Sequence, residues 1–183
     1  MKRNKLIFFF KIILKTKVLE IMKFITLFFV VLLAHPINIY ATDVQIGSST
    51  AGSTYNAPFN GYYDYSWADM RFLQSEIGVA GDISAIKFQV ANNPASYTMN
   101  NQKIYVKTTS STTYSGCSYP GTGSFTKVYD GSITYNGSGW ITVTFSTSFY
   151  YDNTSNLEIL FENRDGSGAA GYPTFYYTST GSN

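Results

Sequence analysis

Hydrophobic and polar residues alternate in four short runs, at residues 84–90, 103–107, 140–147 and 156–163. Every second residue in these runs is hydrophobic, and the residues between them are mostly polar. This period of two predicts strands of antiparallel sheets, with one face in a core and the other in solvent. The residues expected to face the core are Ile86, Phe88, Val90, Ile104, Val106, Ile141, Val143, Phe145, Leu157, Ile159 and Phe161.

Turn-forming pairs separate the runs, among them Asn93-Pro94, Asp130-Gly131 and Asn136-Gly137. Such pairs favour tight turns between short strands, and no helical period appears beyond residue 41. The pattern predicts an all-β fold for residues 42–183: a two-sheet antiparallel sandwich that is jelly-roll-like.

Residues 1–41 have a different composition. In the segment 22–41, Lys23 precedes an apolar run at 24–34, and Pro36 and the small residue Ala41 follow. This layout predicts a secretory signal peptide cleaved after Ala41. Met22 fits a start codon, so residues 1–21 are either a mis-assigned upstream start, which we favour, or an extended basic segment. A spanning helix needs roughly 20 uninterrupted apolar residues, so we expect a secreted or outer-surface protein without a membrane span after cleavage.

Loss of the leader changes the charge of the chain. Seven of the 13 basic residues and one of the 11 acidic residues precede Thr42, which leaves six basic and ten acidic residues and a net charge of about −4. An acidic domain without a basic cluster argues against nucleic acid as a partner. The lone Cys117 excludes an internal disulfide.

Residues 128–163 read VYDGSITYNGSGWITVTFSTSFYYDNTSNLEILFEN. They contain an aromatic-x-Gly turn at Tyr129 and Gly131, a Gly139-Trp140 pair that opens a strand, an aromatic corner at 149–152, and an Asn-Leu pair at 156–157. With these motifs the chain resembles the β-sandwich module of secreted multidomain surface proteins of Bacteroidota. The resemblance implies a jelly-roll-like fold, neighbouring fibronectin-type, adhesin or protease domains on the same polypeptide, and export through the type IX system.

Two departures from that module bear on the chain's extent. Ser148 stands where the module usually has proline, and the chain stops at Asn183 where the module continues into further strands. We therefore expect residues 42–183 to be a module truncated at its C-terminal end and part of a longer protein.

Candidate catalytic groups are few beyond residue 41. The single histidine, His35, leaves with the leader, so serine and cysteine nucleophiles lack their usual base. Glu158 and Glu162 share one strand face about 13 Å apart, wider than the paired carboxylates of glycosidases, and we interpret both as solvated. We expect no enzyme activity, with a glycan hydrolase that uses carboxylates alone as the alternative.

Exposed aromatic residues are the better binding candidates, because flat rings suit sugars and protein interfaces. Trp140 alternates with outward residues, but a bulge at Gly139 is expected to turn it inward. The expected ligand-binding residues lie in one loop and one corner: Tyr62, Tyr63, Tyr65, Trp67, Tyr150 and Tyr151.

Asp152, Asn153 and Asn156 offer oxygen ligands within one turn, but calcium needs about 6–8 oxygens. We expect no cofactor, with calcium at these three residues as the alternative. The sequence thus favours a non-catalytic adhesion, recognition or spacer module that contacts a glycan or a surface protein. The alternative is an accessory module of a secreted hydrolase whose catalytic domain lies outside this chain.

Overall fold

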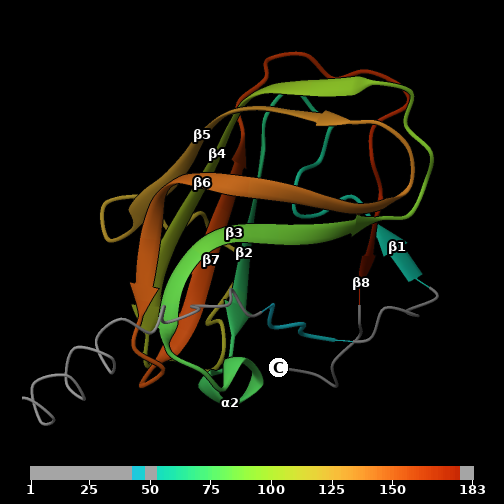
Figure 1. Cartoon of the computed structure of the whole chain (residues 1–183). Helices are drawn as coiled ribbons and strands as arrows, with labels where there is room; N and C mark the ends of the chain where they lie inside the picture. Colours follow the sequence, from blue (N-terminus) through green and yellow to red (C-terminus); the bar gives the residue numbers. More distant parts are fainter. Residues whose placement is uncertain (1–42, 48–52, 178–183) are drawn as a thin grey trace, which may run out of the picture. The chain divides into compact units, whose positions relative to one another are not determined.

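The computed structural model describes residues 43–47 and 53–177 (Figure 1). The chain divides into two units, Met1–Asp43 and Val44–Asn183, and every element described below belongs to the second unit. The predicted signal peptide lies outside the described residues. Within the described part of the chain, no helix is long and apolar enough to cross a membrane.

The second unit is built from two antiparallel four-stranded sheets. Their strands are β1 (Ser53–Tyr55), β2 (Ser66–Phe72), β3 (Gly81–Val90), β4 (Tyr97–Thr109), β5 (Thr126–Tyr135), β6 (Gly139–Tyr151), β7 (Asn156–Asn163) and β8 (Phe175–Tyr177), with one short helix, α2 (Gln74–Ile77). Sheet A has the order β1-β8-β3-β6, and sheet B has the order β2-β7-β4-β5. Figure 1 shows β3 and β6 in front of β2 and β7.

The strand pairs follow a mirrored order along the chain. β1 pairs with β8, β2 with β7, β3 with β6 and β4 with β5, all antiparallel. The chain therefore forms one long hairpin whose tip is the segment 110–125, and this hairpin is rolled into two sheets. Two further pairs complete the sheets. The β3–β8 pair links β1–β8 to β3–β6 in sheet A, and the β4–β7 pair links β2–β7 to β4–β5 in sheet B. This is the eight-stranded jelly roll, so the predicted fold class is confirmed.

The core lies between the sheets and contains the residues that the alternation placed inward. Ile104, Val106, Ile159 and Phe161 are buried, and Ile104 pairs with Phe161 across the β4–β7 ladder. Other predicted inward residues of β3 and β6 are buried or packed against this cluster. The period of two read from the sequence thus corresponds to the observed strands.

Two outward-facing positions differ from expectation. Glu158 and Glu162 are each only 2 % exposed, so their interpretation as solvated residues is wrong. β7 is a central strand, and the segment 110–125 covers its outer face: Tyr119 donates a hydrogen bond to Glu162. Leu160, on the same outer face, is fully buried as well.

The expected inward turn of Trp140 is also wrong. Trp140 is 53 % exposed and pairs with Gln89 on the outer face of sheet A. The register irregularity between β3 and β6 lies at Ile83 and Ala85, far along the ladder from Gly139, so nothing reverses the alternation at Trp140.

Candidate ligand-binding groove

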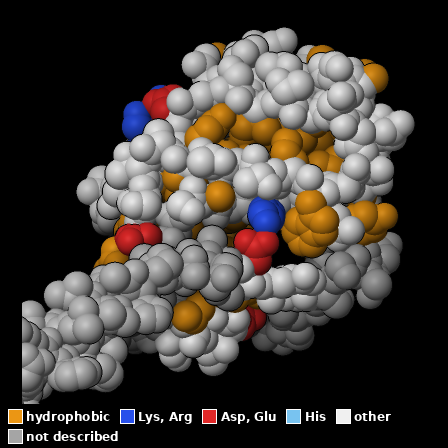
Figure 2. Space-filling view, in the orientation of Figure 1, with side chains coloured by type: hydrophobic (Ala, Val, Ile, Leu, Met, Phe, Trp, Pro, Cys, Tyr) orange, Lys and Arg blue, Asp and Glu red, His pale blue; other side chains and the backbone are white. Residues whose placement is uncertain are grey.

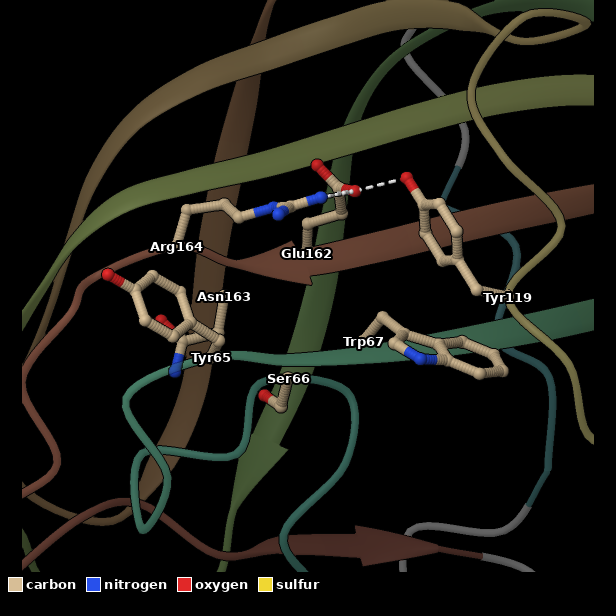
Figure 3. Close-up of a pocket in the computed structure, with 7 residues that line it drawn as sticks. All are labelled: Tyr65, Ser66, Trp67, Tyr119, Glu162, Asn163 and Arg164. Carbon is tan, nitrogen blue, oxygen red and sulfur yellow. Dashed lines mark hydrogen bonds and ion pairs between the residues drawn. The ribbon is translucent and has the colours of Figure 1, made fainter.

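A cavity of about 370 Å³ lies at the outer face of sheet B, where β2 begins and β7 ends. We call it the aromatic groove, and its lining residues are Tyr65, Ser66, Trp67, Tyr119, Glu162, Asn163 and Arg164. Figure 3 shows Arg164 and Tyr119 extending from opposite sides toward Glu162, with Trp67 beside Tyr119 and Tyr65 near Asn163.

Strand register brings most of these residues together. Ser66 lies opposite Asn163, and Trp67 lies opposite Glu162, in the antiparallel β2–β7 pair. Cross-strand neighbours on one face have Cβ atoms about 4.5–5.5 Å apart. On the outer face, Trp67 of β2 therefore stands beside Glu162 of β7. Tyr65 and Arg164 extend the groove past the strand ends.

Tyr119 reaches the groove from the segment 110–125, the tip of the long hairpin, which we call the covering loop. Its ring lies 5.7 Å from that of Trp67, at an interplanar angle of 66°. Edge-to-face packing of this kind is a favoured aromatic arrangement. Trp67 and Tyr119 are 41 % and 42 % exposed, so both rings keep accessible surface.

Glu162 is the charged centre of the groove. Its Oε1 accepts hydrogen bonds from Tyr119 Oη and from Arg164 Nη2, the latter at 2.6 Å, and its Oε2 accepts one from Tyr105 Oη at 3.3 Å. Burial by itself raises the pKa of Glu162, but the hydrogen bonds from Arg164 and Tyr119 outweigh it and hold that pKa below its usual value. Glu162 is thus ionised and paired, which suits structure and recognition rather than proton donation.

Asn163 anchors the loop that carries Tyr65. Its Nδ2 donates to the carbonyl oxygens of Asn60 and Tyr63, each at 3.0 Å. Its Oδ1 accepts from Gln102 Nε2 at 2.6 Å and from the backbone N–H of Asp165 at 3.1 Å. The side chain of Asn163 therefore uses its full hydrogen-bonding capacity and fixes the segment 60–65, which we call the tyrosine loop.

The segment after β7 braces the tyrosine loop from the other side. The backbone N–H of Gly166 donates to the carbonyl of Asp64 at 2.9 Å, and that of Gly168 donates to Asp64 Oδ1 at 2.7 Å. A Cβ at Gly168 would lie 2.5 Å from the carbonyl oxygen of Tyr62. Only glycine permits this close approach of the two backbones.

A second polar cluster holds the covering loop against sheet B. Arg71 Nε donates to Glu158 at 3.0 Å, and Arg71 Nη1 donates to Ser111 Oγ and to the carbonyl of Thr113. The guanidinium also lies 4.1 Å from the ring centre of Tyr114, a cation–π contact. Lys107 Nζ completes the pairing of Glu158 at 2.8 Å.

Asp69 lies beside this second cluster and has an unusual acidity. Burial, followed by the charge of Glu158, raises the pKa of Asp69 to about 6, against the opposing charges of Arg71 and Lys107. The same two cations hold the pKa of Glu158 below its usual value despite burial. The two carboxyl groups therefore titrate well apart, but all of Glu158's oxygens are already paired with cations, so we assign the cluster a structural role.

The predicted ligand-binding residues divide into three groups. Tyr65 and Trp67 line the groove, and Tyr62 and Tyr63 lie on the adjoining tyrosine loop. Tyr150 is exposed on β6, in the other sheet, and does not line the groove.

Tyr151 requires a correction. Its side chain is 1 % exposed, and its hydroxyl donates to the carbonyl of Ser155. It faces the core because it follows Phe149 by two residues along β6, so it presents no surface to a ligand.

Sequence reasoning missed Tyr119, Glu162, Asn163 and Arg164 as groove residues. Tyr119 lies in a segment without periodicity, and Arg164 lies just beyond a strand end. The one available signal was Leu160, a hydrophobic residue between the two outward glutamates, which indicates a strand covered on both faces.

The oxygens proposed for calcium are engaged within the protein. Asp152 Oδ1 accepts from the backbone N–H of Thr154, Asn153 Oδ1 accepts from Gln74 Nε2, and Asn156 Oδ1 accepts from the backbone N–H of Gln74. Asn156 also donates to the carbonyl of Ser111. Across residues 43–47 and 53–177, no three His, Cys, Asp or Glu side chains form a metal-binding group.

Comparison with known proteins adds no relative: no family model, no curated protein and no solved structure matches this chain. The case for a function therefore depends on the groove itself.

Proposed function

We propose that this protein is a secreted, non-catalytic recognition module that binds neutral carbohydrate in the aromatic groove. The observation that carries the proposal is an accessible cavity walled by Tyr65, Trp67 and Tyr119, with one internally neutralised ion pair at its centre. The signal-peptide pattern and the resemblance to modules of secreted Bacteroidota proteins support a location outside the cell, as part of a larger surface or extracellular protein.

The aromatic walls suit the C–H faces of sugar rings. Binding pockets commonly combine hydrophobic or aromatic walls with a few polar groups that fix orientation. Here the polar groups are the hydroxyl of Tyr119, which donates to Glu162 and can still accept, and the guanidinium of Arg164, whose side chain is half exposed. These groups donate and accept hydrogen bonds, as sugar hydroxyls require.

The charge of the groove favours a neutral ligand. Arg164 and Glu162 are paired at 2.6 Å, so their charges cancel at the centre of the site. On the opposite side of the sandwich, the β3–β6 side shown in Figure 2, charged side chains form small separate groups on a mainly uncharged surface. On the groove's own face, the described cations Arg71, Lys103, Lys107 and Arg164 each pair with a carboxylate. An anionic polymer therefore gains little from them, and we expect binding that changes little with salt.

A glycan array of neutral oligosaccharides tests the proposal, followed by titration calorimetry on the glycans bound. We expect Trp67→Ala to lower the affinity at least tenfold, equivalent to about 1.4 kcal/mol, while Trp67→Phe retains most of the binding. Trp140→Ala is the matched control, because Trp140 is also an exposed tryptophan but lies on the other sheet. This substitution is expected to leave the affinity unchanged.

Three results would contradict the proposal. An array without a single binder would leave only a spacer role. Equal losses in the two tryptophan variants would remove the groove as the site. Hydrolysis of a bound glycan by the protein alone would overturn the non-catalytic assignment, whereas a hydrolase domain elsewhere on the polypeptide would make the module its accessory.

A further inference from the structure

The tyrosine loop carries more exposed aromatic surface than the groove itself uses. Tyr62 and Tyr63 are 58 % and 56 % exposed, although tyrosine side chains in proteins are commonly half-buried or more. Neither residue lines the groove. Two adjacent solvent-facing rings at the end of a sandwich therefore call for an explanation other than capping of the core.

The rings of this loop are held in place rather than loosely tethered. The ring of Tyr62 packs edge-to-face against Tyr63 at 4.9 Å and against Tyr172 at 5.7 Å. The backbone N–H of Tyr62 donates to Asn60 Oδ1 at 3.1 Å, and the carbonyl of Tyr63 accepts from Asn163 Nδ2. A surface that is already ordered loses less entropy when a ligand binds.

The tyrosine loop is continuous with the aromatic groove. Asn163 lines the groove and holds the carbonyl of Tyr63 directly. Tyr65, two residues farther along, is itself a groove wall. The stretch from residue 63 to residue 67 spans at most about 14 Å when fully extended, so Tyr63 and Trp67 lie within reach of one short oligosaccharide.

We propose that Tyr62 and Tyr63 form a second subsite that binds further sugar units of the same carbohydrate chain, so that the ligand is an oligosaccharide of three or more units rather than a single sugar. This inference rests on the proposed function of the groove. The loop disfavours an anionic occupant, because residues 60–65 contain one carboxylate, Asp64, and no lysine or arginine.

The test is an array that carries each neutral glycan as a series of one to six sugar units. We expect affinity to rise with length up to at least three units. The double variant Tyr62→Ala/Tyr63→Ala should lower binding of the long glycans between about threefold and tenfold, to the level of the short ones. The matched control is Tyr176→Ala/Tyr177→Ala, an adjacent pair of exposed tyrosines on β8, which should change neither series.

Thermal unfolding of each variant shows whether it is folded. The single variant Tyr63→Ala serves if the double variant does not fold, because Tyr63 has one ring contact, to Tyr62, among the described residues. Glycan binding that is flat with length and unaffected by Tyr63→Ala would overturn the second subsite alone. Absence of binding to every series would instead refute the groove as a carbohydrate site.

Discussion

Replacement of Arg71 by methionine tests whether a buried ion pair holds the covering loop against sheet B. The side chains of Arg71 and Glu158 are 10 % and 3 % exposed. Methionine keeps much of the hydrophobic stem of arginine but removes the charge and all of its hydrogen bonds. The substitution leaves Glu158 buried with Lys107 as its remaining cation.

The expected cost follows from the interactions that the substitution removes. Removal of one partner of a buried ion pair typically costs about 3–5 kcal/mol. Lys107 still neutralises Glu158, which lowers that figure, while Ser111 and Thr113 lose their hydrogen bonds to the guanidinium and gain solvent instead. We expect Arg71→Met to lower the free energy of unfolding by about 3 kcal/mol.

Urea unfolding followed by tryptophan fluorescence provides the measurement. With a slope of about 1–3 kcal/mol per molar urea, the midpoint should fall by about 1–3 M without a change in slope. Lys127→Met is the control: Lys127 pairs with Asp130 at 2.6 Å, but both side chains are well exposed. A surface pair contributes about 1 kcal/mol or less.

Two outcomes would refute this reasoning. If Lys127→Met costs as much as Arg71→Met, burial does not decide the strength of the pair. If the double variant Arg71→Met/Glu158→Gln is as unstable as the sum of the two single variants, the residues are not coupled.

Two further predictions concern pH and backbone packing. The native pKa of Asp69 is about 6, above its unfolded value of 3.8, so the stability it contributes at low pH should be lost as pH rises from about 4 to 6. Asp69→Asn should abolish that decline, measured as urea midpoints from pH 4.5 to 7.5. This range lies above the pKa of Glu158, which is lowered from its usual value. A decline that persists in the variant would belong to another group. Gly168→Ala should cost about 1–3 kcal/mol because its Cβ meets the carbonyl of Tyr62. Gly123→Ala, with open space around its Cβ, should be neutral or slightly stabilising in the same assay, and equal costs would contradict the packing argument.

The sequence was sufficient for the sandwich because strand burial follows a period of two. Continued along β6, the same period also places Tyr151 beside Phe149 on the inner face, so its burial was within reach of sequence reasoning. The burial of Glu158 and Glu162 was not, because it depends on where an aperiodic loop crosses the sheet. Tyr65 and Trp67 were identified as surface aromatics, whereas Tyr119 joins them only through the folded path of residues 110–125.

The mirrored strand order also sets the sequence in which the domain can assemble. The β4–β5 pair joins Lys103 and Asp130, 27 residues apart, whereas the β2–β7 pair joins Arg71 and Glu158, 87 residues apart. Loop closure costs more entropy as the separation grows, and distant pairings form slowly. Folding should therefore start at the hairpin tip and proceed outward, with β1 and β8 joining last. The strands that carry the groove meet late, so a chain that stops before Asn156 can complete the β4–β5 hairpin but never the binding site.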